Sequence, residues 1–169
     1  MFLKNNKKGQ VTQVLTLMLV IFVVGLTVIL GKLILSSFYT AIESENTDAM
    51  TTAQESVEAQ YAVFDYGLVT LTIIMIIGLS ITSFLIPTHP IFFGINVVGI
   101  FFLVFIGMIL TNVYGEMVAG ETGISTGLDE VAEDYSKTNF LLSKLPYIGA
   151  VVLGIVSIVQ FSKGRGSGY

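Results

Sequence analysis

Four apolar runs separated by polar segments set the pattern of this chain. They cover residues 12–31, 67–86, 91–110 and 145–161, and none of them contains a charged side chain. An α-helix rises about 1.5 Å per residue, so about 20 apolar residues are enough to cross the roughly 30 Å hydrocarbon core of a bilayer. The pattern predicts an all-α, polytopic membrane protein with four transmembrane helices in one membrane domain over residues 1–169.

A very short connection separates the second run from the third. It consists of Pro87-Thr88-His89-Pro90. Pro87 lacks a backbone N–H and ends a helix, whereas the fixed φ of Pro90 suits the first position of the next helix. We therefore expect the second and third helices to form a tight antiparallel hairpin. His89 is the only histidine, and a metal site needs several convergent ligands, so we interpret it as a polar residue of the turn.

The segment before the second run has a helical pattern of its own. Apolar side chains recur there every three or four residues, which places them on one face of a helix over residues 49–64. They are Met50, Ala53, Val57, Tyr61 and Phe64. We expect this extramembrane helix to continue into the second transmembrane helix, as a rod that stands above the membrane.

The remaining polar segments are predicted to be less regular. Residues 111–144 read as an acidic loop broken by Gly120, Gly123 and Gly127, with a short acidic helix over residues 128–135. Residues 162–169 read as a flexible basic tail, because glycine and serine dominate them.

Charge divides the polar segments into two kinds. The N-terminal tail has three lysines and no acid, the C-terminal tail has Lys163 and Arg165 and no acid, and all 12 acids lie between residues 43 and 134. Lysine and arginine next to transmembrane helices stay on the cytoplasmic side. Four helices then place both termini inside (N-in, C-in) and both acidic connections outside. Lys32 and Lys144, at outer helix ends, have stems long enough to reach the interface.

Composition narrows the function. Only 12 % of the residues are charged, against about 25 % in ordinary soluble domains. The chain has no Cys, no charge within an apolar run, no phosphate-binding glycine loop and no nucleophile–base pattern. Ion-coupled transporters depend on ionisable groups inside the membrane. We therefore expect no enzyme, no cofactor, no metal, no nucleic acid and no small-molecule substrate. The predicted partners are the lipid bilayer, further copies of the chain and other membrane or coat proteins.

Small and polar residues within the runs are candidates for helix packing. Small residues let helix backbones approach closely in lipid, and polar side chains form modest hydrogen bonds between helices. The glycine candidates are Gly78, Gly94, Gly99, Gly107, Gly149 and Gly154. Asn96 is the strongest polar residue in a run, and Thr70, Thr72, Ser80, Thr82 and Ser83 form a milder polar set on the second helix. These residues predict a packed bundle or an oligomer.

Short motifs from the second run onwards suggest a family. They are F-D-Y-G at 64–67, T-H-P-I-F-F at 88–93, N-V-Y-G-E at 112–116, T-N-F at 138–140 and L-P at 145–146. In this order they resemble small integral membrane proteins of tailless icosahedral viruses that carry an internal membrane under a double-jelly-roll coat. The resemblance implies a virion membrane protein that fills the vesicle or links it to the coat. It implies no catalytic residues.

Other classes remain open at this stage. A holin-like pore former fits the small size, the several spans and the basic tail, although the two acidic connections fit it less well. Nothing in the sequence excludes an accessory subunit of a cellular membrane complex. K-K-G-Q at 7–10 resembles an archaeal prepilin cleavage site. Mature pilins have one hydrophobic helix, whereas three more apolar runs follow here, so we interpret the first run as a membrane helix.

Overall fold

A computed structural model describes residues 10–42, 47–85, 91–119 and 128–164. These residues form six helices: α1 Gln10–Ile42, α2 Thr47–Leu85, α3 Ile91–Ala119, α4 Leu128–Asp134, α5 Ser136–Ser143 and α6 Leu145–Gly164. Four of the helices, α1, α2, α3 and α6, are long and apolar enough to cross a membrane. The predicted all-α architecture with four candidate spans is thereby confirmed.

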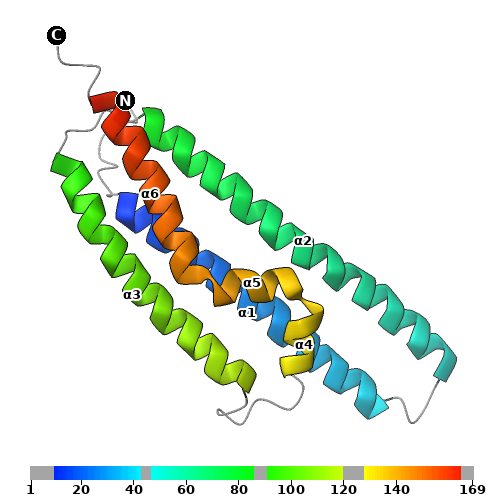
Figure 1. Ribbon diagram of the computed structural model, residues 1–169. Helices are drawn as coiled ribbons and strands as arrows, with labels where there is room; N and C mark the ends of the chain where they lie inside the picture. The colour runs from blue at the N-terminus through cyan, green and yellow to red at the C-terminus, as the bar shows by residue number, and fades with distance from the viewer. Residues whose placement is uncertain (1–9, 43–46, 86–90, 120–127, 165–169) are drawn as a thin grey trace, which may run out of the picture.

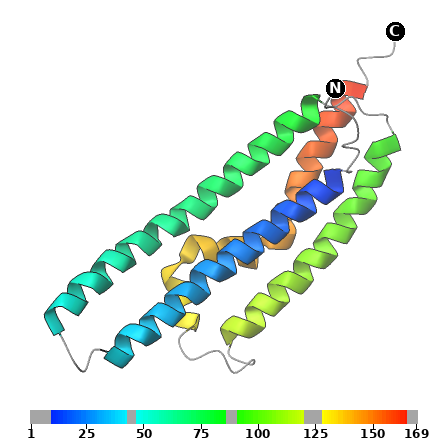
Figure 2. The ribbon, with the colours of Figure 1, turned by 180° about the vertical axis from the view of Figure 1, so that it is seen from behind.

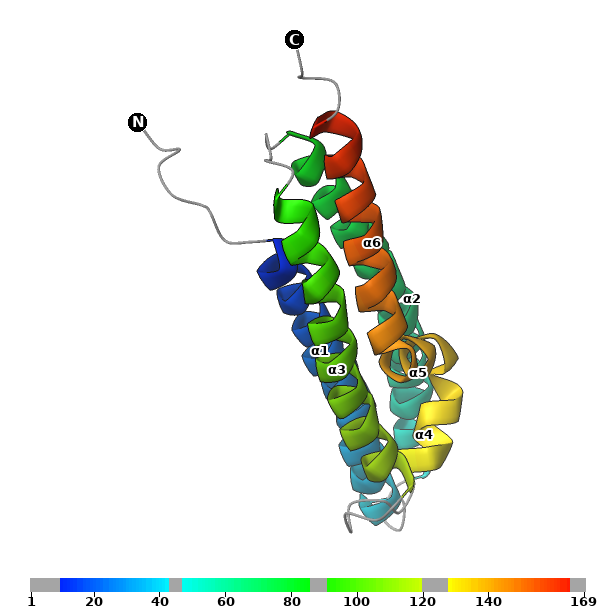
Figure 3. The same cartoon turned by 60° about the vertical axis from the view of Figure 1, so that its left-hand side comes forward.

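The three longest helices lie side by side along most of their length (Figure 1). Seen from behind, α1 runs between α2 and α3 (Figure 2). The first residue of α1, the last of α2, the first of α3 and the last of α6 lie at the same end of the bundle (Figures 1 and 3). α6 covers only that half of the bundle, and α5 and α4 continue its line toward the opposite end (Figure 3).

The expected tight hairpin of the second and third helices is not found. α2 and α3 run in opposite directions, but within the described residues they make no contact, because α1 and α6 lie between them. α3 packs most extensively against α6, and α2 packs against α1, α5 and α6. The proximity of two helices in sequence therefore does not decide their packing. Pro87, His89 and Pro90 lie outside the described residues.

The helices extend well beyond the apolar runs. α1 continues past residue 31 to Ile42, and α3 continues past residue 110 to Ala119. α2 covers residues 49–64 and most of 67–86 without a break. Within the predicted acidic loop over residues 111–144, the short helix expected over residues 128–135 is present as α4. The rest of the described loop is also helical, because its first part belongs to α3 and residues 136–143 form α5. The apolar runs are the segments that lipid can solvate. A helix can continue beyond such a run where one of its faces packs against a neighbouring helix.

Two apolar clusters fill the interior. The larger joins α1, α2, α3, α5 and α6 around Leu17, Met18, Leu103 and Leu153. The smaller lies at the end that α4 and α5 occupy, where Ile29, Tyr114, Leu128 and Leu142 are buried together. The smaller cluster explains why residues 128–143 fold as helices: Leu128 and Leu142 are almost completely covered by α1 and α3.

Candidate functional site

The most polar buried position of the bundle is Asp65, on α2. Its side chain is 6 % exposed. Oδ1 accepts hydrogen bonds from the backbone N–H and the hydroxyl of Thr138, both at 2.7 Å. Thr138 lies in the first turn of α5, where backbone N–H groups have no partner within the helix. Tyr135, the residue before α5, offers no side-chain cap, so a carboxylate from a different helix caps α5.

Lys137 completes this group, which we call the carboxylate junction: Asp65, Tyr66, Lys137 and Thr138. Nζ of Lys137 lies 3.4 Å from Oδ2 of Asp65 and 3.8 Å from the centre of the Tyr66 ring. Desolvation opposes the charged form of Lys137, but the side chains of Tyr66 and Asp65 favour it more strongly, and the pKa of Lys137 is raised. The junction therefore holds a lysine in its charged form beside a buried carboxylate.

The motifs behind the family resemblance converge around α5. F-D-Y-G contributes Asp65, and T-N-F contributes Thr138 and Asn139. Oδ1 of Asn139 accepts hydrogen bonds from the hydroxyl of Tyr114, in N-V-Y-G-E, at 3.0 Å and from Ser143 at 3.1 Å. Residues that are far apart in the sequence thus meet at one short helix. The first half of T-H-P-I-F-F, residues 88–90, lies outside the described residues.

The L-P motif lies at the bend between α5 and α6, and this bend packs against α3. Pro146 has no N–H, so the carbonyl of Leu142 cannot form the usual helical hydrogen bond. The hydroxyl of Thr111, on α3, donates to this carbonyl at 3.0 Å. One turn earlier on α3, Gly107 faces Pro146, and a Cβ on Gly107 would lie 2.6 Å from the proline Cα. The α5–α6 bend therefore fits a surface made by Gly107 and Thr111.

A second polar group, the amide cluster, lies at the opposite end of α6. It consists of Gln10, Ser83, Asn96 and Gln160, one residue from each long helix. Nδ2 of Asn96 donates to Oε1 of Gln160 at 3.0 Å and to Oε1 of Gln10 at 3.2 Å. Nε2 of Gln10 donates to Ser83 at 2.9 Å, whose hydroxyl lies 3.4 Å from the carbonyl of Val156. Neutral groups alone connect the four candidate spans here.

The other members of the polar set predicted on the second helix bond within α2. Thr70, Thr72, Ser80 and Thr82 each donate to the carbonyl four residues earlier in the same helix. Such back-bonding satisfies a hydroxyl locally. Within the predicted polar set, Ser83 is the residue whose hydroxyl reaches another helix.

The six candidate glycines divide into two equal groups. Gly99 is packed against Val11, Gly107 against Pro146 and Gly149 against Met18, so closely that an added Cβ would collide. Gly78, Gly94 and Gly154 have no neighbouring side chain within 4 Å of such a Cβ. Close packing within the chain is therefore found for the first three, whereas the other three face outward, where contact with another chain stays a prediction. Gly25, which packs against Leu142, was not predicted.

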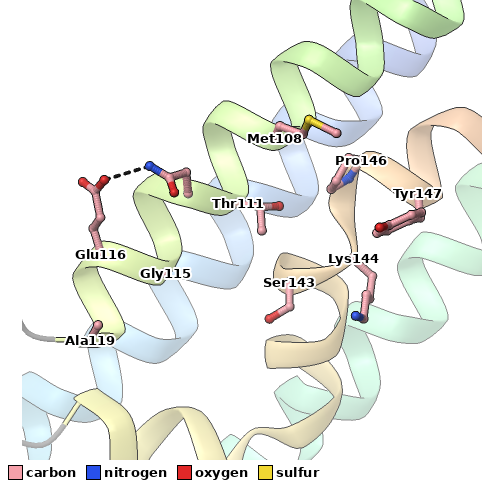
Figure 4. Close-up of a pocket in the computed structure, with 10 residues that line it drawn as sticks. Met108, Thr111, Gly115, Glu116, Ala119, Ser143, Lys144, Pro146 and Tyr147 are labelled. Atoms are coloured by element: carbon pink, nitrogen blue, oxygen red, sulfur yellow. Dashed lines mark hydrogen bonds between the residues drawn. The ribbon is translucent and has the colours of Figure 1, made fainter.

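A groove of about 720 Å³ lies between α3 and the α5–α6 bend (Figure 4). Thr111 and Gly115 line it on α3, and Lys144 and Tyr147 line it on the opposite side. Figure 4 shows Glu116 directed away from Lys144, where it accepts a hydrogen bond from Asn112 at 2.7 Å. In the part of the chain that the structure describes, no group of three His, Asp or Glu residues could hold a metal ion.

Comparison with known proteins finds no matching protein family, no matching characterised protein and no matching solved structure.

Several residues of these sites were missed in the sequence. Gln10 and Gln160 stand at the ends of apolar runs, where an amide is easily read as interfacial, and Asp65 was counted with the acids of a connection. One signal was present: Asp65, Leu68 and Thr72 recur at helical spacing and all are buried. Because this pattern includes an acid, the sequence alone does not mark it as the buried face of a helix.

Proposed function

We propose that this chain is a non-enzymatic structural protein of a virion membrane. In this proposal it crosses the bilayer four times, packs laterally against copies of itself or other membrane proteins, and links the bilayer to coat or neighbouring proteins through the helical region outside the lipid.

The placement of the bilayer is supported by the length of α6 and by the side-chain contacts at its start. The 20 residues of α6 give a helix of about 30 Å, the thickness of the hydrocarbon core. The contacts of Asp65 with Thr138 and of Thr111 with Leu142 hold the predicted ends of two other apolar segments, the start of the second and the end of the third, at the level where α6 begins. The amide cluster then marks one bilayer boundary and the carboxylate junction the other.

The observation that carries the proposal is the apolar outer surface of the spans. Large apolar side chains on the outer faces of α2, α3 and α6 are between one third and three quarters exposed: Leu71, Ile73, Ile74, Ile77, Ile81, Phe84, Ile95, Val98, Phe101, Phe102, Phe105, Met108, Ile109, Val151, Ile155, Ile158 and Phe161. A soluble monomer rarely exposes a continuous apolar patch beyond a few hundred Å². Lipid chains or neighbouring transmembrane helices suit such a surface.

Lateral packing is supported by the three outward glycines. Gly78, Gly94 and Gly154 lie on three different helices and leave room for a close approach. Outside the proposed bilayer, Ile34, Phe38, Val63 and Phe64 are also exposed on α1 and α2. Apolar side chains on this helical region suit contact with protein rather than with water.

Copy number tests the structural role. Particles and cell membranes that contain the chain would be separated, and the chain counted against the coat protein by quantitative mass spectrometry. We expect many copies per particle. A trace amount confined to cell membranes would contradict the virion role, and prompt depolarisation on induced expression would favour a holin-like pore.

Topology tests the bilayer placement separately. The chain has no cysteine, so single-cysteine variants report one position each. We expect Ala59→Cys and Glu133→Cys to react with a membrane-impermeant maleimide from the same side, and Ser167→Cys only from the other side. Labelling of the first two from opposite sides would overturn the four-span arrangement.

A further inference from the structure

We propose that Lys144 and Tyr147 form a binding site for one phospholipid, with the phosphate at Lys144 and an acyl chain in the apolar groove between α2 and α6. The inference goes beyond the structural role. It rests on the bilayer placement proposed above, which puts Lys144 at headgroup level.

Lys144 differs from Lys32 and Lys137 in its surroundings. It is the residue between α5 and α6, and its side chain is exposed at the bend. Lys32 pairs with Asp134, and Lys137 pairs with Asp65. Among the described residues no acid pairs with Lys144, whose Nζ lies 5.9 Å from the centre of the Tyr147 ring. An ammonium group with three donors is therefore available to an anionic ligand.

The surface beside Lys144 is shaped for an acyl chain. A second groove, of about 410 Å³, starts at Lys144 and Tyr147. Its other lining residues are all apolar: Ile76, Phe140, Ile148, Val151 and Val152. Four of these lie in α2 or α6 at the level of the proposed hydrocarbon core, so the groove leads from a cation at the interface into an apolar channel along the bundle.

This combination selects a lipid over other occupants. A free anion would use Lys144 but not the apolar groove, and a plain hydrocarbon would use the groove but not the cation. A phospholipid satisfies both, and Tyr147, with an apolar ring and a polar hydroxyl, suits the headgroup level. The groove of Figure 4 lies on the other side of the same two residues and leaves space beside Lys144 for the rest of the headgroup.

The test is native mass spectrometry of the full chain in detergent, titrated with phosphatidylglycerol or with diacylglycerol of the same acyl chains. We expect one phosphatidylglycerol to bind at least fivefold more tightly than diacylglycerol, which lacks the phosphate. Lys144→Met should weaken phosphatidylglycerol binding about fivefold, the effect of one interfacial lysine. Lys163→Met, which removes the same charge from the far end of α6, should leave it within twofold.

The acyl groove needs its own pair of variants. Val151 and Ile158 are both exposed on α6, but only Val151 lines the groove. We expect Val151→Trp to weaken lipid binding at least threefold and Ile158→Trp to leave it unchanged. Equal binding of the two lipids, equal effects of the two lysine variants, or replacement of lipid adducts by a dimer that Val151→Trp disrupts would overturn the proposal. These results are independent of copy number and of cysteine labelling, so failure here is distinct from failure of the proposed function.

Discussion

The amide cluster and the carboxylate junction both hold helices together through polar side chains, but they use different chemical groups. Both connect polar side chains from several helices near an end of α6. The amide cluster uses neutral groups and joins the four long helices to one another. The junction uses a buried carboxylate and joins α2 to the short helix α5. A neutral amide loses little when a bond lengthens, whereas a buried carboxylate without partners is costly.

The difference suggests a division of roles. Interhelical hydrogen bonds in membrane proteins are worth about 0.6 kcal/mol each on average, so the amide cluster sets the register of the spans more than it stabilises them. The junction caps the first turn of α5, whose N-cap residue forms no side-chain cap. Loss of the junction should therefore release α5 and α4, whereas loss of one amide should leave the fold intact.

Substitution of Asp65 should have the largest effect. Asp65→Ala leaves the N–H and hydroxyl of buried Thr138 without an acceptor. Hydrogen bonds to charged groups contribute about 1.5–3 kcal/mol each, so we expect the free energy of unfolding to fall by about 3 kcal/mol. Asp65→Asn keeps an oxygen acceptor and should cost about half as much. SDS-driven unfolding in bicelles, followed by circular dichroism, measures both. Equal stability of Asp65→Ala and wild type would contradict the cap.

Between the amide cluster and the carboxylate junction, stability depends on how closely the helices pack. Gly107→Ala would place a methyl group against the Pro146 backbone, and overpacking of this kind costs about 1–3 kcal/mol. Gly78→Ala is the matched control, because a Cβ there meets nothing within 4 Å. We expect a loss of about 1–2 kcal/mol for Gly107→Ala and no loss for Gly78→Ala in the same unfolding assay. Because alanine favours a helix more than glycine does, helix propensity cannot explain a loss, and equal stability of the two variants would contradict the close packing of Gly107 on Pro146.

Asn96 tests how much the amide cluster contributes. Asn96→Ala removes two interhelical hydrogen bonds, so we expect a loss of about 1 kcal/mol, a third of that for Asp65→Ala. Asn112, on the same helix, is exposed and donates only to Glu116, one turn away. Asn112→Ala should therefore change stability by less than about 0.5 kcal/mol. If the loss for Asn96→Ala reached that for Asp65→Ala, the proposed division of roles would be wrong.

The sequence was informative about the spans and much less about what lies between them. The four apolar runs correspond to α1, α2, α3 and α6 because lipid solvates apolar side chains whatever their partners. The short helix α4 was predicted, but α5 was not, because Leu142 becomes part of an inward face only once α1 and α3 cover it. The packing order of the helices was equally hidden, since Gly107 and Gly78 look alike until Pro146 is placed beside one of them.

The smallest effect concerns the charge on Lys137. Because its pKa is raised above the ordinary value of 10.5, the folded state favours the charged form. The contribution of Lys137 to stability is then fully present at neutral pH and is lost as the pH rises above 10.5 through the folded-state pKa. We expect the stability difference between wild type and Lys137→Met to stay constant from pH 7 to about pH 10 and to shrink above it. Because neutral groups make up the amide cluster, wild type and Asn96→Ala should keep a constant difference over the same titration. A difference that shrank equally for both would assign the pH dependence to the bundle as a whole and not to the carboxylate junction.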